Sequence, residues 1–270
     1  MNEAMMESIQ ESCAVLHLNL TGKEFAAMVT EQSLSEETVN AMEQLLLHLR
    51  ERKRQATVQT LLRLSRLPLR NPRTFDNFNF SLIHGKDTRK LEQLRTLSAV
   101  YAHKNIALIG PPGTGKTHLA QAFGYSCCQN GLKTYFIKMT ELNDRFHAAR
   151  QGGKTARLLN MLVRPSCLII DEVGHCELDK ENTRMFFDLI DRRYNKQGAF
   201  NMIFTSNKNP SEWRSSFNED DALLCALDRI FDDAMVFLLR GNSFRGQQME
   251  TFTVQTEKQR LAGSVEQPRI

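Results

Sequence analysis

The residues best suited to chemistry lie between 110 and 117, where the sequence reads Gly-Pro-Pro-Gly-Thr-Gly-Lys-Thr. This segment fits the pattern G-x-x-x-x-G-K-[ST] at every fixed position. Its glycines allow successive backbone N–H groups to turn inward around an anion. Lys116 would set its ammonium group against the β- and γ-phosphates of a nucleotide, and Thr117 would offer its hydroxyl group to Mg²⁺. The predicted nucleotide-binding residues are Gly110, Pro111, Pro112, Gly113, Thr114, Gly115, Lys116, Thr117 and His118.

The sequence on both sides of this segment supports the same prediction. An apolar run of strand length, 105–109, precedes it, and 118–123 reads as a helix whose N-terminus would face the phosphates. The alternative is a glycine turn between a strand and a helix, with a chance lysine. Because a chance match in a chain of this length is on the order of one in a hundred, nucleotide binding is favoured.

A second group of candidate residues follows the apolar run 167–170. Asp171, at the end of this strand, could hold Mg²⁺ through its water shell, and Glu172 could polarise the attacking water as a general base. A simple turn is the alternative. Asn207 ends another strand-like run, 200–207, where it could orient that water, contact the γ-phosphate or merely cap a turn.

Strand-like and helix-like segments alternate between residues 105 and 239. This alternation predicts an α/β fold with a parallel sheet that is covered on both faces. The expected strands cover 105–109, 133–139, 167–172, 200–207 and 235–239. The expected helices cover 118–123, 140–151, a short stretch that ends at 162, 178–193 and 222–234.

The composition is typical of a soluble globular protein, with 41% hydrophobic and 24% charged residues. The length of 270 residues allows one sizeable α/β domain plus an appendage. No apolar run approaches the ~20 residues of a membrane span, and the N-terminus lacks the features of a signal peptide. The six cysteines contain no C-x-x-C pair, so reduced thiols are expected rather than disulfides or zinc. These features predict a cytoplasmic protein without a membrane partner.

Charge is distributed unevenly over the first part of the chain. Residues 1–49 hold eight glutamates against one lysine, whereas residues 50–73 hold eight basic residues against one glutamate. A helix is expected from 36 to about 66, with Ser35 as its N-cap and the following prolines at its end. Its basic end could be a solvated face, but beside a nucleotide site we favour contacts with DNA phosphates. The predicted nucleic-acid contacts are Arg50, Arg52, Lys53, Arg54, Arg63 and Arg66.

The segment 71–83 contains Phe75, Phe78 and Phe80 and reads as a linker whose aromatic side chains dock on the following domain. For each ring, packing in the core is favoured over stacking on adenine. The end of the chain, 246–270, is polar and is expected to form a frayed tail.

Several motifs, taken together, resemble one family. After the phosphate segment and its continuation His118-Leu119-Ala120 come Leu168-Ile-Ile-Asp-Glu-Val-Gly174, Phe204-Thr-Ser-Asn207 with Glu212-Trp213, Leu227-Asp-Arg229 and Gly241-Asn-Ser-Phe-Arg245. Over about residues 40–246 the chain is similar to the IstB family, the helper ATPases of bacterial insertion sequences. This family resembles DnaC-type helicase loaders and belongs to the AAA+ superfamily.

The resemblance implies an AAA+ P-loop fold in which the strand 200–207 lies between the phosphate-loop strand and the Asp-Glu strand of a five-stranded parallel sheet. It implies ATP hydrolysis with ATP and Mg²⁺ as cofactors. It also implies homo-oligomers that assemble on duplex DNA with ATP between subunits, select or deform target DNA and recruit the cognate transposase. The implied domains are a helical DNA-contacting and oligomerisation domain over 1–70, an ATPase domain over 71–246 and a tail over 247–270.

The resemblance also implies roles for single residues. Lys116, Glu172, Asn207 and Arg229 would be catalytic, with Arg229 acting as an arginine finger on the ATP of a neighbouring subunit. Arg245 resembles the second-sensor arginine that contacts the nucleotide. For Arg229 the alternative is a surface ion pair with the adjacent Asp232-Asp233, which replaces a pair of histidines usual in the family.

Three other functions remain open on the sequence. A replicative helicase loader of the DnaC type would bind a hexameric helicase instead of a transposase. A small-molecule kinase would use the same phosphate segment and ignore DNA, but the charged N-terminal extension argues against it. A DNA-binding scaffold would use ATP only as an assembly ligand, without hydrolysis.

Overall fold

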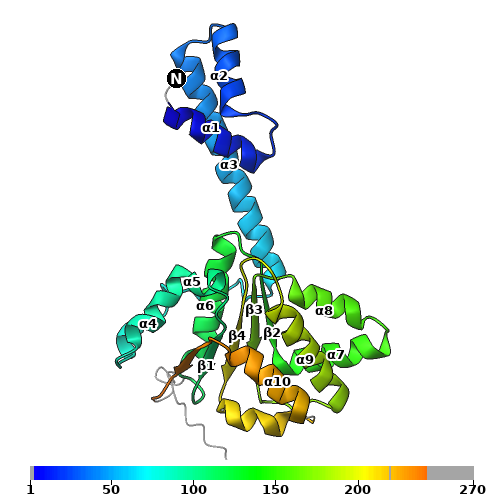
Figure 1. Cartoon of the computed structure of the whole chain (residues 1–270). Helices are drawn as coiled ribbons and strands as arrows, with labels where there is room; N and C mark the ends of the chain where they lie inside the picture. Colours follow the sequence, from blue (N-terminus) through cyan, green and yellow to red (C-terminus); the bar gives the residue numbers. More distant parts are fainter. Residues whose placement is uncertain (1–2, 219, 242–270) are drawn as a thin grey trace, which may run out of the picture.

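Five parallel strands form a single sheet in the order β2-β3-β4-β1-β5 (Figure 1). The structure is a computed structural model that describes residues 3–218 and 220–241. The strands are β1 (Ile106–Ile109), β2 (Thr134–Lys138), β3 (Cys167–Asp171), β4 (Asn201–Ser206) and β5 (Met235–Leu238). All five predicted strands are confirmed, each shorter by one or two residues, and β4 lies between β1 and β3 as the family resemblance implies.

Two apolar clusters cover the two faces of the sheet, because successive residues of a strand point to opposite faces. In β3, Leu168 and Ile170 belong to the cluster formed with α7, α8, α9 and α10, whereas Cys167 and Ile169 belong to the cluster formed with α6. These helices are α6 (Lys116–Gln129), α7 (Met139–Gln151), α8 (Thr155–Val163), α9 (Lys180–Tyr194) and α10 (Asp220–Phe231), with the 3₁₀ turn η3 (Pro210–Ser216) before α10. The predicted helices are confirmed with shifted ends: α6 is longer than predicted, α9 begins at Lys180 rather than at 178, and α10 covers 220–231 rather than 222–234.

Three helices form a bundle of their own before the sheet domain: α1 (Glu3–Leu16), α2 (Gly22–Glu31) and the first half of α3 (Glu36–Ser65). The apolar core of this bundle is formed by Ile9, Cys13, Phe25 and Val39. α3 then extends away from the bundle to the sheet domain, where its far end contacts α6 and β2 (Figure 1). Among the described residues, no helix combines the length and the apolar character that a membrane crossing requires.

Both ends of α3 have local causes. At its start the Ser35 hydroxyl accepts the backbone N–H of Thr38 at 3.3 Å, which confirms the predicted N-cap. At its end Arg66 adopts a left-handed conformation with φ 64°, so the helix stops before Pro68 and Pro72. The predicted end of the helix near residue 66 is confirmed, and Pro68, two residues beyond the C-cap, stands where a proline that cannot continue the helix is common.

The linker after α3 docks on the sheet domain, as predicted. Phe75 and Phe78 are buried in the same cluster as the apolar face of α6, so they pack in the core. The Arg95 guanidinium lies 5.6 Å from the centre of the Phe75 ring and also pairs with Asp76 at 2.8 Å. Sequence analysis did not predict the short elements that follow, which are η1 (Phe80–Leu82), α4 (Thr88–Glu92), η2 (Gln93–Thr96) and α5 (Ser98–Tyr101).

Among the residues that the structure describes, Arg193 is the one arginine that is fully buried. Arg193, near the end of α9, donates to the carbonyl oxygens of Leu162, Val163 and Pro165 at 3.0–3.1 Å and to that of Asn201 at 2.7 Å. Burial lowers the pKa of its guanidinium to about 10. The side chain therefore provides hydrogen-bond donors for carbonyl oxygens at and after the end of α8 and connects them to the start of β4.

Replacing Arg193 with methionine should lower the free energy of unfolding by about 3 kcal/mol or more, because the carbonyl oxygens of Leu162, Val163 and Asn201 would lose a guanidinium donor, whereas that of Pro165 keeps its bond from Lys196. Urea unfolding followed by circular dichroism measures this change. Arg192→Met is the matched control, because Arg192 is exposed and its described ion pair is the surface pair with Asp188, and it should change stability by about 0.5 kcal/mol or less. A loss below about 1 kcal/mol for Arg193→Met would mean that these carbonyl oxygens find other partners.

Candidate nucleotide site

The phosphate segment forms a loop between β1 and α6, and two of its glycines are required by their surroundings. A Cβ atom on Gly110 would lie 2.0 Å from the carbonyl oxygen of Leu239, the residue after β5. Gly115 has φ 90°, a conformation that favours glycine, and a Cβ atom there would lie 2.8 Å from the ring of Phe78. The loop is therefore enclosed by β5 on one side and by the linker on the other.

Lys116 is the first residue of α6, and only 6% of its surface is exposed. Its ammonium group donates to the carbonyl oxygens of Gly110 and Pro111, each at 2.7 Å. These bonds hold a positive charge across the loop at the N-terminus of a helix. A helix N-terminus with an adjacent ammonium group is a favourable place for the phosphates of a nucleotide.

Asp171 is buried at the end of β3 and receives two hydroxyl groups on the same oxygen. Thr117 Oγ1 donates to Asp171 Oδ1 at 2.9 Å, and Thr205 Oγ1 donates to it at 2.5 Å. Burial raises the pKa of this carboxyl group, while the two hydrogen bonds oppose that change. Hydroxyl and carboxylate oxygens are the ligands that Mg²⁺ prefers, so Thr117 and Asp171 fit the predicted metal site.

Glu172 directly follows β3 with a left-handed backbone, φ 62°. Its backbone N–H donates to Thr205 Oγ1 at 3.0 Å, and its carboxylate pairs with the ammonium group of Lys138 at 3.1 Å. Lys138 lies at the end of β2, where the parallel register places it opposite Asp171. The ion pair holds the carboxylate of Glu172 beside the buried carboxylate of Asp171.

Thr205 and Lys138 belong to the site although no motif in the sequence predicts a role for them. Each is a polar residue at the carboxyl end of a strand, and the carboxyl ends of parallel strands meet at one edge of the sheet. Their positions at strand ends could have pointed to the site. This signal requires the order of the strands in the sheet, because only neighbouring strands bring their ends together. Thr205 is 1% exposed, so its hydroxyl group acts inside the protein.

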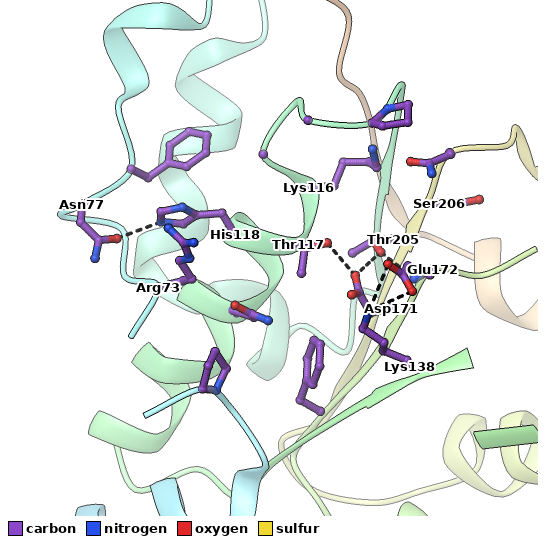
Figure 2. Close-up of a pocket in the computed structure, with 18 of the residues that line it drawn as sticks. Arg73, Asn77, Lys116, Thr117, His118, Lys138, Asp171, Glu172, Thr205 and Ser206 are labelled. Carbon is purple, nitrogen blue, oxygen red and sulfur yellow. Dashed lines mark hydrogen bonds and ion pairs between the residues drawn. The ribbon is translucent and has the colours of Figure 1, made fainter. Parts of the chain in front are cut away.

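These residues line one cavity of about 790 Å³ (Figure 2). Its volume is within the range of small-molecule and cofactor sites. Asn207 also lines it, one residue beyond β4. The structure therefore brings most of the predicted site residues together; those lining the cavity are Pro112, Gly113, Gly115, Lys116, Thr117, His118, Asp171, Glu172 and Asn207.

His118 joins the phosphate loop to the linker. Its Nε2 atom lies 2.9 Å from two acceptors, the carbonyl oxygen of Thr74 and Oδ1 of Asn77, so Nε2 carries a proton. The ring also meets the ring of Phe78 edge-on, with 5.0 Å between centres. Burial lowers the pKa of His118; the hydrogen bond to Thr74 opposes this change, and the charge of Arg73 adds to it.

Arg229 lies outside this cavity, on α10. Its guanidinium pairs with Asp191 at 3.1 Å and lies 5.2 Å from the centre of the Phe187 ring. The alternative of an ion pair with Asp232 or Asp233 is wrong, because Asp232 accepts the hydroxyl group of Tyr194 and Asp233 pairs with Lys104. Arg245, the other predicted arginine, lies outside the described residues.

The six predicted DNA contacts follow the second half of α3, apart from Arg66 just beyond its end. Arg50 pairs with Glu11 of α1 at 3.2 Å. Arg66 pairs with Glu141, the residue that also pairs with Arg145, and so fastens the end of α3 to α7. The remaining four residues, Arg52, Lys53, Arg54 and Arg63, are exposed or half-buried.

The fold and the cavity define a P-loop protein of the AAA+ type. Two solved structures share this fold. The DnaC helicase loader matches with a TM-score of 0.50 and 20% identity over 61% of this chain and 97% of that one. AMPPCP-bound DnaA from Aquifex aeolicus matches with a TM-score of 0.51 and 21% identity over 64% of this chain and 51% of that one.

The sequence comparisons identify the family. The model of the IstB-like ATP binding proteins matches residues 13–251, and the chain belongs to this family. It is 36% identical over 257 residues to the insertion sequence IS5376 putative ATP-binding protein of Geobacillus stearothermophilus, covering 95% of this chain and 99% of the relative. It is 30% identical over 240 residues to the insertion sequence IS21 putative ATP-binding protein of Pseudomonas aeruginosa, covering 89% and 82%.

Replacing Lys116 with alanine should weaken ATP binding at least about 100-fold, because a positive charge at the loop would be lost. Fluorescence of an N-methylanthraniloyl-labelled ATP measures the affinity. Lys104→Ala, which removes a surface lysine paired with Asp233, should leave the affinity unchanged. ATP affinity that survived Lys116→Ala would refute the site.

Proposed function

We propose that the protein is a DNA-binding ATPase that assembles on duplex DNA and assists transposition by selecting target DNA and recruiting the transposase. The main support is the single cavity that collects the phosphate loop, the Thr117–Asp171 pair and Glu172. The insertion-sequence origin in the names of the relatives supports the transposition part of the proposal.

Hydrolysis would use residues that already face one another across the cavity. Lys116 and the loop N–H groups would bind the phosphates, and Thr117 and Asp171 would hold Mg²⁺, which neutralises phosphate charge when bound. The carboxylate of Glu172 would take a proton from the water that attacks the γ-phosphorus. The bond from the γ-phosphorus to the bridging oxygen would break, and that oxygen would leave as part of ADP. The amide of Asn207 would orient that water.

Assembly would complete the site in each subunit. Arg229 is partly exposed, with 30% of its side chain accessible, and the ion pair with Asp191 holds it beside α9. A neighbouring copy that docked there would receive this guanidinium at its γ-phosphate, so hydrolysis would depend on assembly. Arg245 would contact the nucleotide from the segment that follows β5.

DNA would bind along the second half of α3, which lies between the helical bundle and the sheet domain (Figure 1). Its exposed basic side chains suit phosphate contacts, which carry little sequence preference. We divide the chain accordingly into a DNA-contacting and oligomerisation region over 1–70, an ATPase domain over 71–246 and a tail over 247–270. We place the protein in the cytoplasm, where bacterial DNA lies.

Replacing Glu172 with glutamine should leave ATP binding intact and lower turnover at least about 100-fold, because the general base would be lost. A phosphate-release assay with duplex DNA measures turnover, and light scattering measures whether ATP then traps the assembled form. Glu177→Gln is the control, since Glu177 is an exposed carboxylate that does not line the cavity. An unchanged rate in Glu172→Gln would remove Glu172 from this role.

Replacing Arg52, Lys53 and Arg54 together with glutamine should weaken binding to duplex DNA and lower the slope of log affinity against log salt by about 2 to 3. Fluorescence anisotropy at several salt concentrations measures both quantities. The control variant replaces Lys86, Arg89 and Lys90, three exposed basic residues at and before α4, and carries the same change in net charge. Equal effects of the two variants would mean that only net charge matters.

A helicase loader remains the second candidate, since the DnaC helicase loader shares the fold over 97% of its length. Co-purification with the replicative helicase and with the transposase encoded beside the gene decides between the two. Retention of the helicase alone would favour the loader. Binding of ATP and DNA without hydrolysis would instead favour the assembly scaffold, and turnover with a small acceptor that ignores DNA would favour a kinase.

A further inference from the structure

The linker between α3 and β1 forms one wall of the nucleotide cavity. Asn71, Arg73, Asn77 and Phe78 all line it. Figure 2 shows Arg73 and Asn77 across the cavity from Lys138 and Glu172. Two contacts hold the linker there, namely the Phe78 ring over Gly115 and the bonds of Thr74 and Asn77 to His118. A segment that lies more than thirty residues before the phosphate loop therefore completes the cavity.

Arg73 differs from the other arginines of this region. Arg66 pairs with Glu141 and Arg95 pairs with Asp76, but within residues 3–218 and 220–241 Arg73 has no described carboxylate partner. It is exposed, it lines the cavity, and Figure 2 shows it beside His118, across the cavity from Lys138. The wall contributed by the linker thus carries a positive charge that no described acidic residue neutralises.

The order of residues along the loop indicates which part of a nucleotide lies near this charge. The lysine of such a loop reaches the β- and γ-phosphates, and the loop N–H groups hold the α- and β-phosphates. Thr117 faces Asp171 on the metal side, whereas the next residue, His118, faces the linker. A nucleotide with its γ-phosphate beside Glu172 would therefore place its α-phosphate on the side of His118 and Arg73.

We propose that Arg73 is a nucleotide-binding residue whose guanidinium pairs with the α-phosphate of the bound nucleotide. This inference rests on the proposed ATP binding. Arg73 lies eight residues beyond Ser65, the last residue of α3. The segment that leaves the DNA-contacting helix would thus also contact the nucleotide, so nucleotide occupancy would restrain the position of that helix relative to the sheet.

The test compares Arg73→Gln with Arg70→Gln, a matched exposed arginine of the same linker that does not line the cavity. Labelled ATP and labelled ADP are titrated into the full chain, and duplex DNA is titrated separately without nucleotide. Arg73→Gln should weaken ATP and ADP by the same factor, about 10- to 100-fold, because both carry the α-phosphate. Arg70→Gln should change neither affinity, Arg73→Lys should recover part of the loss, and DNA affinity should stay the same in Arg73→Gln.

Other outcomes would overturn the proposal in distinguishable ways. Unchanged affinity for both nucleotides would exclude Arg73 from the site, and a loss for ATP alone would place it at the γ-phosphate. A fall in DNA affinity with nucleotide binding intact would assign Arg73 to the DNA surface. If the unmodified chain bound neither nucleotide, the proposed function itself would fail, whatever the role of Arg73.

Discussion

The buried carboxylate of Asp171 links the packing of the sheet domain to the geometry of the nucleotide site. It joins three elements, since it belongs to β3 and receives hydroxyl groups from Thr117 of α6 and Thr205 of β4. A buried carboxylate without such partners would be costly, because its charge loses the solvation of water. The three elements are therefore held in the arrangement that also brings the phosphate loop beside Glu172.

The linker between α3 and β1 forms the wall of the nucleotide cavity that the sheet does not supply. Phe78 covers Gly115 closely enough that no larger residue fits beside it, and His118 donates a hydrogen bond to the linker. Apolar packing and polar bonding thus act on the same few residues at the start of α6. This dual contact explains why a segment outside the alternating strand and helix region belongs to the cavity.

The first part of the chain separates two kinds of surface along one helix. Within residues 1–73, the part that forms the bundle around Ile9 and Val39 carries most of the acidic residues, whereas the second half of α3 and the residues just after it carry most of the basic ones. The pair between Arg50 and Glu11 lies at the boundary, and the pair between Arg66 and Glu141 joins the far end of the helix to α7. Between these two ion pairs the helix carries basic side chains that are exposed to solvent, and such a cluster of positive charge attracts a polyanion.

The five strands, the helices between them and the long helix α3 were predictable in their order along the chain, because periodic apolar residues, caps and glycine turns act locally; the short elements η1, α4, η2 and α5 were not. The sequence predicted the parallel sheet, α3 with its Ser35 cap and the loop around Lys116, and a family resemblance placed β4 between β1 and β3. The meetings of residues from distant segments became visible in the folded chain alone: Thr205 and Lys138 beside Asp171 and Glu172, Arg73 across from them, Asp191 with Arg229, and Arg193 between the end of α8 and the start of β4. Such contacts arise from the packing of elements that lie far apart in the chain, whereas the spacing of residues along one element records only which of its faces is apolar.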